Sequence, residues 1–557
     1  MTRRFNTVGA CNPKEHYVLD AKERLSQVKA LVDQSGCFWL YGPSQTGKTT
    51  VMQLWAMELT KRGKYAALLV SAASLAGLES DKWPYKAPNE WSGRSAIVED
   101  AFLYELRAAA HRLPEDCQPP DWGYQVAGQR IRAALAAWAN VCPRPLVLFI
   151  DDVDTLRGRS LLFLLRQLAS GLNQRPQPFP QSIALMALQD LNYWSGDELD
   201  VKNPDKNLAG DLFLPTPGGV FHGMRTATLE LQFFSLEEVA NVYQKHTNAT
   251  GQLFTLEAVD RAFEVTQGQP WLVNAIAQYA VAQTEDPIEP HHIESAAAHI
   301  LCQSSINYPF PLDHLPARLQ QFQAILEPVL TEKVLRRPTN QQIQMVVATG
   351  ICRFDAAGGL VISNPLYRDV ILRQLAMPAI ASLGSIKSTW ITLDGTVNVQ
   401  QVWDAFVTLW QSQGDALMQT VIYESIAPYM AVMAFCHRLT APHGVLNAAY
   451  RFQDHSMSLT LQMVTPSQSL VLLVQVIVWS EGNPEPLELG LSRLEHSINQ
   501  EAEDPVSLSA NLSETPETPY ACLIMIDQRC DRLSCHERTR LDSASTSTGL
   551  TVSVIHG

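Results

Sequence analysis

The sequence contains no apolar run that approaches the roughly 20 residues a helix needs to cross a bilayer, which excludes a helical membrane protein. Residues 1–6 lack the apolar core of a secretion signal. The ten cysteines are scattered without a pairing rhythm, which is typical of reduced thiols. We therefore expect a cytoplasmic protein with no membrane partner.

Positive charge is also scarce in this chain. It has 42 Lys and Arg residues against 56 Asp and Glu residues, and the net charge of −14 argues against constitutive nucleic-acid binding. A local basic face remains open. Charged residues make up 18% of the chain and hydrophobic residues 46%, which is typical of packed domains rather than disorder. Because 557 residues exceed one hydrophobic core, we expect two to four domains.

Residues 42–49 match the full phosphate-binding pattern G-x-x-x-x-G-K-[ST]. An apolar strand is expected at 37–41 and a helix from 50 onward, and this context argues against a chance match. The turn would aim backbone N–H groups at a phosphate, Lys48 would reach the β- and γ-phosphates, and Thr49 would bind Mg²⁺. We therefore expect ATP and Mg²⁺ as cofactors, with nucleotide contacts from Gly42, Pro43, Ser44, Gln45, Thr46, Gly47, Lys48, Thr49 and Thr50.

Short apolar runs alternate with longer helical stretches, which predicts an α/β fold. Beyond the first strand, we expect strands at 66–71, 146–150, 182–187 and 227–231. These runs are continuously apolar rather than alternating, so both faces of each strand should be buried. The sequence therefore predicts a mostly parallel sheet.

An acidic pair, Asp151-Asp152, follows the third apolar run. A carboxylate at this place would accept a hydrogen bond from Mg²⁺-bound water, and its neighbour would orient the attacking water. We assign Asp151 to the metal and Asp152 to the water. Gln189, after the fourth run, would sense the γ-phosphate. The alternatives are a cap at a strand-to-helix turn for the pair and a solvated loop residue for Gln189.

Several segments together resemble one family of prokaryotic AAA-like ATPases related to the signal-transducing (STAND) NTPases. Besides the phosphate loop and the acidic pair, they are residues 5–13, His16-Tyr17, 267–275 and 363–371. The resemblance covers roughly residues 1–375. It implies an ATPase core, a helical lid and a winged helix.

The resemblance also places Asn12, Pro13 and Tyr17 on the adenine side, with Pro270 approaching from the lid. Close relatives often have Asp-Glu at the acidic pair, and many have arginine where this chain has Gln189. Because Asp152 is one methylene shorter than glutamate, we expect ATP binding with slow hydrolysis.

Many members of this group carry a C-terminal domain similar to PD-(D/E)XK nucleases. Residues from about 390 keep its outline, but Ser458 stands where relatives have aspartate, and Gln475-Val476-Ile477 stands where they have Glu-x-Lys. Nuclease chemistry needs clustered carboxylates and a lysine. Residues 377–557 hold 8 Lys/Arg against 18 Asp/Glu, a balance that repels a DNA backbone. We expect a degenerate, restriction-endonuclease-like α/β domain; a shifted active site that uses Asp454, or an unrelated α/β domain, is the alternative.

The expected division is an ATPase core at 1–235, a helical lid at 236–290, a winged-helix-like domain at 291–376, a linker at 377–389 and the nuclease-like domain at 390–557. The leading hypothesis is an ATP-binding regulatory switch that oligomerises or contacts a protein partner through its C-terminal domain. One alternative is an ATP-dependent nuclease that acts on DNA in defence or mobile-element functions. The other is a scaffold stabilised by ATP or ADP.

Overall fold

The computed structural model divides the chain into two compact units. Unit 1 comprises Met1–Ile293 and Gln344–Gly350, and unit 2 comprises Glu294–Ile343 and Ile351–Gly557. The residues that the structure describes are 3–76, 78, 90–123, 126–156, 158–190, 225–304, 312, 315–331, 335, 340–384, 390–392, 394–440, 444–447, 456–464, 469–479, 486–503, 520–528 and 534–557.

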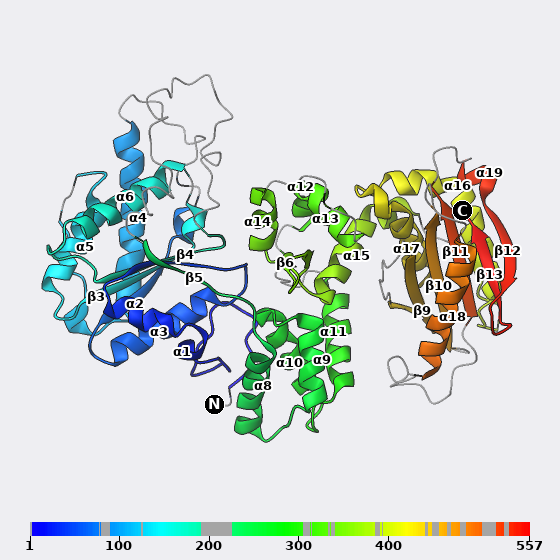
Figure 1. Ribbon diagram of the computed structural model, residues 1–557, viewed down its shortest axis with the longest axis horizontal. Coiled ribbons are helices and arrows are strands. Elements are labelled where there is room, and N and C mark those ends of the chain that lie inside the picture. The colour runs from blue at the N-terminus through cyan, green and yellow to red at the C-terminus, as the bar shows by residue number, and fades with distance from the viewer. Residues whose placement is uncertain are drawn as a thin grey trace. The chain divides into compact units, whose positions relative to one another are not determined.

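Unit 1 is built around a five-stranded sheet (Figure 1). In chain order its strands are β1 (Cys37–Tyr41), β2 (Ala66–Ser71), β3 (Leu146–Asp151), β4 (Ser182–Ala187) and β5 (Arg225–Glu230). They lie in the order β2-β3-β4-β1-β5, and every neighbouring pair is parallel. The predicted parallel sheet is therefore confirmed.

Helices cover both faces of this sheet, as Figure 1 shows. Phe38 and Leu40 of β1 belong to the core that contains α2 (Gln27–Asp33) and α3 (Lys48–Lys61). Trp39 points to the opposite face, because successive strand residues alternate. Its core contains residues of three further helices, α4 (Glu90–Ala110), α5 (Arg130–Val141) and α6 (Gly158–Asn173). Burial on both faces explains the continuous apolar runs.

The rest of unit 1 joins an N-terminal arm to a three-helix segment. The arm is residues 3–17 and leads into the short helix α1 (Ala21–Arg24). The three-helix segment comprises α8 (Leu236–Thr250), α9 (Leu256–Thr266) and α10 (Pro270–Gln283). Phe5 of the arm packs against Tyr243 of α8, with ring centroids 5.9 Å apart. The Trp271 indole N–H of α10 donates to Thr7 O over 2.8 Å.

The turn between α9 and α10 requires glycine at one position. Gly268 has φ +72°, and a Cβ atom there would lie 1.8 Å from the carbonyl oxygen of Phe234. Gln269 then caps α10, because its side chain accepts from the backbone N–H of Leu272, and Pro270 follows at the first helical position. Residues 268–270 thus form a tight helix junction.

The first part of unit 2 is helical and contains one small hairpin. The helices are α11 (Pro290–Ser304, which begins in unit 1), α12 (Leu315–Gln321), α13 (Gln323–Leu330), α14 (Asn340–Ala348, which ends in unit 1) and α15 (Pro365–Ser382). The hairpin pairs β6 (Cys352–Phe354) with β7 (Leu360–Ile362) in antiparallel fashion.

A six-stranded mixed sheet forms the second part of unit 2 (Figure 1). Its order is β12-β13-β11-β10-β9-β8, with parallel pairing of β11 to β10 and β13. The strands are β8 (Gly444–Asn447), β9 (Ser456–Val464), β10 (Ser469–Trp479), β11 (Tyr520–Asp527), β12 (Arg540–Ser545) and β13 (Thr551–His556). The helices of this part are α16 (Val399–Gln419), α17 (Ala427–Thr440), α18 (Leu487–Glu503) and the short α19 (Cys535–Arg538).

Two features of unit 2 differ from expectation. Residues 377–382, expected as the start of a linker, are the last turns of α15, and they stay helical because Ala379 and Ile380 are buried. The other boundaries of the five-part division stay predictions. The strands β8, β12 and β13 were not predicted, and β12 is a mostly exposed edge strand without an apolar run.

We predict that Gly268→Ala lowers the free energy of unfolding by more than about 3 kcal/mol, measured by chemical denaturation. A left-handed alanine costs about 1–2 kcal/mol, and the collision with Phe234 O adds to it.

The matched control is Gly251→Ala at the end of α8. Gly251 has a similar φ of +85° but no atom within 4 Å of an added Cβ. Only the conformational cost of about 1–2 kcal/mol should appear there. Equal losses for the two variants would contradict the packing argument.

Candidate nucleotide-binding site

The phosphate loop connects β1 to α3 at the carboxyl edge of the sheet. Gln45 and Gly47 have positive φ values of 64° and 88°. Gly42 is packed so closely that an added Cβ would lie 2.2 Å from Leu231 O. The buried Thr46 fixes the turn by donating its hydroxyl to Pro43 O over 3.0 Å. These contacts fix a compact turn before the N-terminus of α3, the kind of backbone that forms anion sites.

Lys48, the first residue of α3, is buried with its ammonium held by the loop itself. Its Nζ donates to Gly42 O over 2.7 Å and to Pro43 O over 3.0 Å. Burial lowers the pKa of Lys48, while the charges of Asp151, Asp154 and Asp152 act in the opposite direction. An ammonium that is bonded to neutral carbonyls is strongly attracted to phosphate oxygens, because a charged partner offsets the cost of burial.

Thr49 and Asp151 meet as the sequence predicted for a metal pair. The Thr49 hydroxyl donates to Asp151 Oδ2 over 2.5 Å, although the two residues lie 102 positions apart. Only 2% of the Asp151 surface is exposed. Burial, and then the charge of Asp152, raises the pKa of Asp151 to about 6.

The donor set at this point fits Mg²⁺ together with a nucleotide. A hydroxyl and a carboxylate are the hard oxygen ligands that this ion prefers, and Mg²⁺ in such sites is completed by phosphate oxygens and water. Among the residues that the structure describes, no group of three or more His, Cys, Asp or Glu side chains forms a self-sufficient metal site. Thr49 and Asp151 would therefore hold the ion only alongside a phosphate.

Asp152 is held in place by a residue that sequence reasoning missed. It adopts a left-handed conformation with φ 56°, and its Oδ2 accepts from the Ser71 hydroxyl over 2.7 Å. Ser71 ends β2, and it pairs in register with Asp151 of β3. A serine at the end of a strand was the available signal, but the order of the strands was needed to use it.

Asp154 is a second residue that the sequence reasoning passed over. Its carboxylate accepts from Leu188 N over 3.3 Å, just beyond β4, and its charge acts on Lys48. Burial raises the pKa of Asp154 as well. The run Asp151-Asp152-Val153-Asp154 was visible in the sequence, and only its first two members were assigned.

Gln189 follows β4, which lies between β1 and β3 in the sheet. Its carbonyl accepts from the Trp39 indole N–H over 2.9 Å, so its backbone is anchored near the end of β1. Its side chain is partly buried. The assignment of this side chain to the γ-phosphate stays a prediction.

The arm passes beside the start of α3. Cys11 N donates to the Thr50 hydroxyl over 3.1 Å, so Thr50 contacts the arm. Asn12 N donates to His16 Nδ1 over 2.9 Å, and residues 12–16 form a compact turn that includes Pro13. The adenine contacts of Asn12 and Pro13 stay predictions.

Tyr17 contacts the three-helix segment, and Pro270 belongs to it. Tyr17 is buried, its ring centroid is 5.0 Å from that of Phe5, and its hydroxyl lies 3.3 Å from His246 Nδ1. These contacts join the arm to α8. Pro270 is buried at the start of α10. A role for either residue in binding adenine stays a prediction.

The phosphate loop also bonds the second piece of unit 1, residues 344–350. Ser44 N donates to Ala348 O over 2.9 Å. Gly350 has φ +80°, and an added Cβ would lie 3.4 Å from Ser44 O. One loop amide is therefore already engaged by a segment about 300 residues away in sequence.

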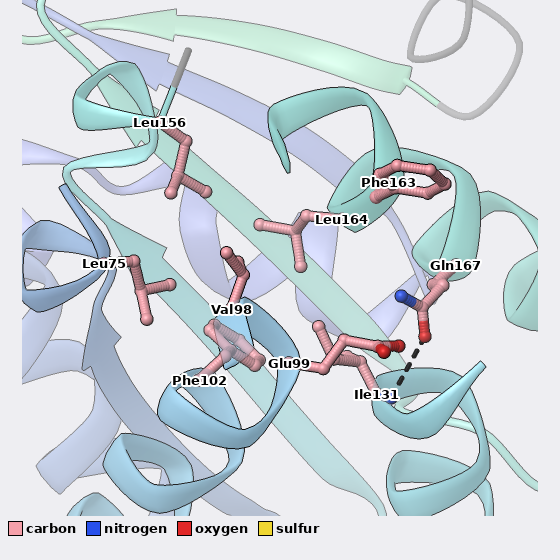
Figure 2. A pocket seen from close by; sticks show the side chains of 9 residues that line it. All are labelled: Leu75, Val98, Glu99, Phe102, Ile131, Leu156, Phe163, Leu164 and Gln167. Carbon is pink, nitrogen blue, oxygen red and sulfur yellow. Dashed lines mark hydrogen bonds between the residues drawn. The ribbon is translucent and has the colours of Figure 1, made fainter. Parts of the chain in front are cut away.

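Side chains of α4, α5 and α6, with Leu75 and Leu156, line a small cavity (Figure 2). None of its lining residues belongs to the phosphate loop. Its two polar residues complete the N-terminus of α5. Glu99 accepts from Gly128 N and Arg130 N over 2.7 and 2.9 Å, and Gln167 Oε1 accepts from Ile131 N over 3.0 Å. The other lining side chains are apolar. The polar groups of this cavity therefore serve the helix rather than a nucleotide.

Comparison with known proteins indicates which kind of domain unit 1 contains. Residues 22–179 match the family model for the AAA ATPase domain. That segment contains the phosphate loop, the acidic pair and the five helices described above as covering the sheet, α2 to α6. Unit 1 carries an AAA-like ATPase domain. No helix among the described residues is long and apolar enough to cross a membrane.

Three solved structures illustrate the overall likeness of the chain to known folds, and each is distant. The Walker-type ATPase PABY2304 of Pyrococcus abyssi is 12% identical, with a TM-score of 0.40 over 66% of this chain and 99% of that chain. The ORC1 protein of Aeropyrum pernix, solved with DNA, is 14% identical, with a TM-score of 0.32 over 64% and 93%. Thermotoga maritima RuvB is 13% identical, with a TM-score of 0.31 over 62% and 92%. No curated protein sequence matches the chain.

We predict that Mg–ATP affinity falls below about pH 6, by about tenfold per pH unit, because Mg²⁺ must displace the proton on Asp151. The same raised pKa favours the folded, nucleotide-free protein at low pH. That contribution to stability is lost as pH rises from about 3.8 to about 6.

Titration calorimetry across this range would measure the effect, with Asp151→Asn as the reference. The ionisation of ATP itself is common to both proteins, so the difference between their pH profiles reports Asp151. Parallel profiles would contradict the assignment.

Proposed function

We propose that this protein is an ATP-binding regulatory ATPase of the AAA-like, STAND-related type, which hydrolyses ATP slowly. The observation that carries the proposal is the Thr49–Asp151 hydrogen bond beside the buried ammonium of Lys48. It unites the two halves of a nucleoside-triphosphate site at one edge of the sheet.

Each residue then has a distinct task. The backbone amides of residues 44–49 and Lys48 bind the phosphates, and Thr49 with Asp151 holds Mg²⁺. The ion, when bound, neutralises charge on the β- and γ-phosphates. Asp152 would orient the attacking water, but its carboxylate is already engaged by Ser71. This engagement, together with the short aspartate side chain, supports slow turnover.

The contact at Ser44 supports a switch. Its partner Ala348 lies in a seven-residue piece of unit 1 whose flanking residues, Ile343 and Ile351, both belong to unit 2. A phosphate that draws the loop amides inward competes with Ala348 for Ser44 N–H. Release of this piece would act on unit 2 through the chain on both sides.

For the C-terminal sheet we propose a degenerate nuclease-like domain that mediates contacts with a partner or a second copy. Ser458 and Gln475 are directly opposed on β9 and β10, and the serine hydroxyl donates to Gln475 Oε1 over 2.6 Å. Ile477 is buried in the apolar core. Neutral groups thus occupy the positions where a nuclease would need two carboxylates and a lysine. Asp454, the alternative acid, lies outside the described residues.

Turnover and mass in solution test the switch together. The wild type should hydrolyse ATP at well under 1 per second, below the usual enzyme range of about 1–10³ per second. Asp152→Asn should abolish turnover while ATP still binds. The mass measured by light scattering should differ between the ATP and ADP states. Rapid turnover, or one mass in every state, would refute the switch.

A nuclease assay distinguishes the proposed switch from the alternative, an ATP-dependent nuclease. Purified protein with Mg²⁺ and ATP should leave linear and supercoiled DNA intact, because no carboxylate cluster is present at Ser458 and Gln475. Degradation that requires ATP and is lost in both Lys48→Ala and Asp454→Ala would favour the ATP-dependent nuclease.

A further inference from the structure

Arg24, the last residue of α1, is buried where the phosphate loop approaches the three-helix segment. Its side chain is 5% exposed. Its guanidinium donates to three acceptors: Thr46 O over 3.3 Å, Gln232 O over 2.7 Å and Glu238 Oε1 over 2.9 Å. The first acceptor belongs to the phosphate loop, the second follows β5, and the third lies in the first turn of α8.

Glu238 has two roles at the start of α8. Its Oε2 accepts from Ser235 N over 2.9 Å, and Ser235 Oγ accepts from Glu238 N over 3.2 Å. This reciprocal pair is a capping box. The same carboxylate therefore caps the helix with one oxygen and binds Arg24 with the other, so the direction of α8 is tied to the guanidinium.

The surroundings of Arg24 restrict the position of its guanidinium. Its guanidinium stands 4.7 Å from the ring centroid of Phe234. Burial lowers the pKa of Arg24, and the charge and hydrogen bond of Glu238 oppose that shift. A buried cation with one carboxylate and two carbonyl partners has little freedom to move unless its partners move with it.

The bond to Thr46 O bears directly on the phosphate site. Thr46 O and Gly47 N–H belong to one planar peptide unit and point in opposite directions. Because Arg24 binds this oxygen, the Gly47 N–H points away from the guanidinium. A phosphate bound to this N–H would polarise the peptide and strengthen its hydrogen bond to Arg24.

We propose that Arg24 is the positioning residue that couples the phosphate loop to α8. The coupling rests on the proposed function, since ATP at the loop is its input. Phosphate binding displaces the Thr46 peptide, and Arg24 transmits this displacement to Glu238. Because Glu238 belongs to the capping box, the first turn of α8 then shifts.

Two substitutions isolate the coupling. Arg24→Lys keeps the charge but loses the fork that reaches several acceptors at once. Glu238→Gln removes the carboxylate but keeps a side chain that can complete the capping box. Glu237→Gln is the matched control, because Glu237 is an exposed glutamate in the same first turn.

Hydrogen exchange of the full chain, with and without Mg–ATP, provides the readout, alongside ATP affinity. In the wild type and in Glu237→Gln, ATP should protect residues 42–50 and also change exchange at 236–250. In Arg24→Lys and Glu238→Gln at saturating ATP, protection of 42–50 should persist while the response at 236–250 disappears. Affinity for ATP should fall at least about fivefold, the lower end of typical couplings.

The outcomes separate the coupling from the proposed function. An undiminished response at 236–250 in both variants overturns the role of Arg24 alone. Absence of protection at 42–50 in the wild type overturns the proposed function, and the coupling with it. If Arg24→Lys fails to fold, Glu238→Gln decides by the same two readouts.

Discussion

The structure depends on the way charge is buried at the carboxyl edge of the parallel sheet. Lys48 brings an ammonium to this edge. The carboxyl groups come from Asp151 at the end of β3 and from Asp152 and Asp154 in the turn that follows. Burial is costly for Lys48, Asp151 and Asp154, and it shifts the pKa of each toward the neutral form. When an anion and a cation bind at this site together, their charges offset the free-energy cost of burying these groups. Mg²⁺ and a nucleoside triphosphate have that composition.

The surrounding strands, loops and side chains position the charged groups at this edge of the sheet. The apolar strands fix β1 beside β4 and β3 beside β2, so Thr49 and Ser71 reach consecutive aspartates. Gly42 lets the loop lie against Leu231 O. Arg24 holds the outer side of the same loop and ties it to Glu238. A change of phosphate occupancy therefore meets a network of buried polar contacts, and such networks move in concert.

The sequence predicted the elements well and the side-chain contacts poorly. Strands β1 to β4 are continuous apolar runs, and the phosphate loop is a local pattern, so both could be read without tertiary knowledge. Strand β5 is polar at four of its six positions and partly exposed, so the expectation of burial on both faces is wrong for this strand. Ser71, Asp154 and Arg24 could not, because their partners depend on strand order and on contacts across up to 214 positions. The exposed strand β12 lacks an apolar run, and the helical residues 377–382 contain Pro378, which favoured a linker. In the C-terminal sheet, the neutral pair Ser458–Gln475 was foreseen as residue types, and the structure adds that the two are hydrogen-bonded.

The central claim is that ATP binds at residues 42–49, and the most direct test is the ATP dissociation constant of Lys48→Ala measured by titration calorimetry. Lys61→Ala is the matched control, because Lys61 is an exposed lysine at the other end of α3. Loss of a charge-assisted contact of about 1.5–3 kcal/mol predicts a rise of roughly tenfold or more for Lys48→Ala. The control should bind like the wild type. Equal ATP affinity in Lys48→Ala and the wild type would contradict the account.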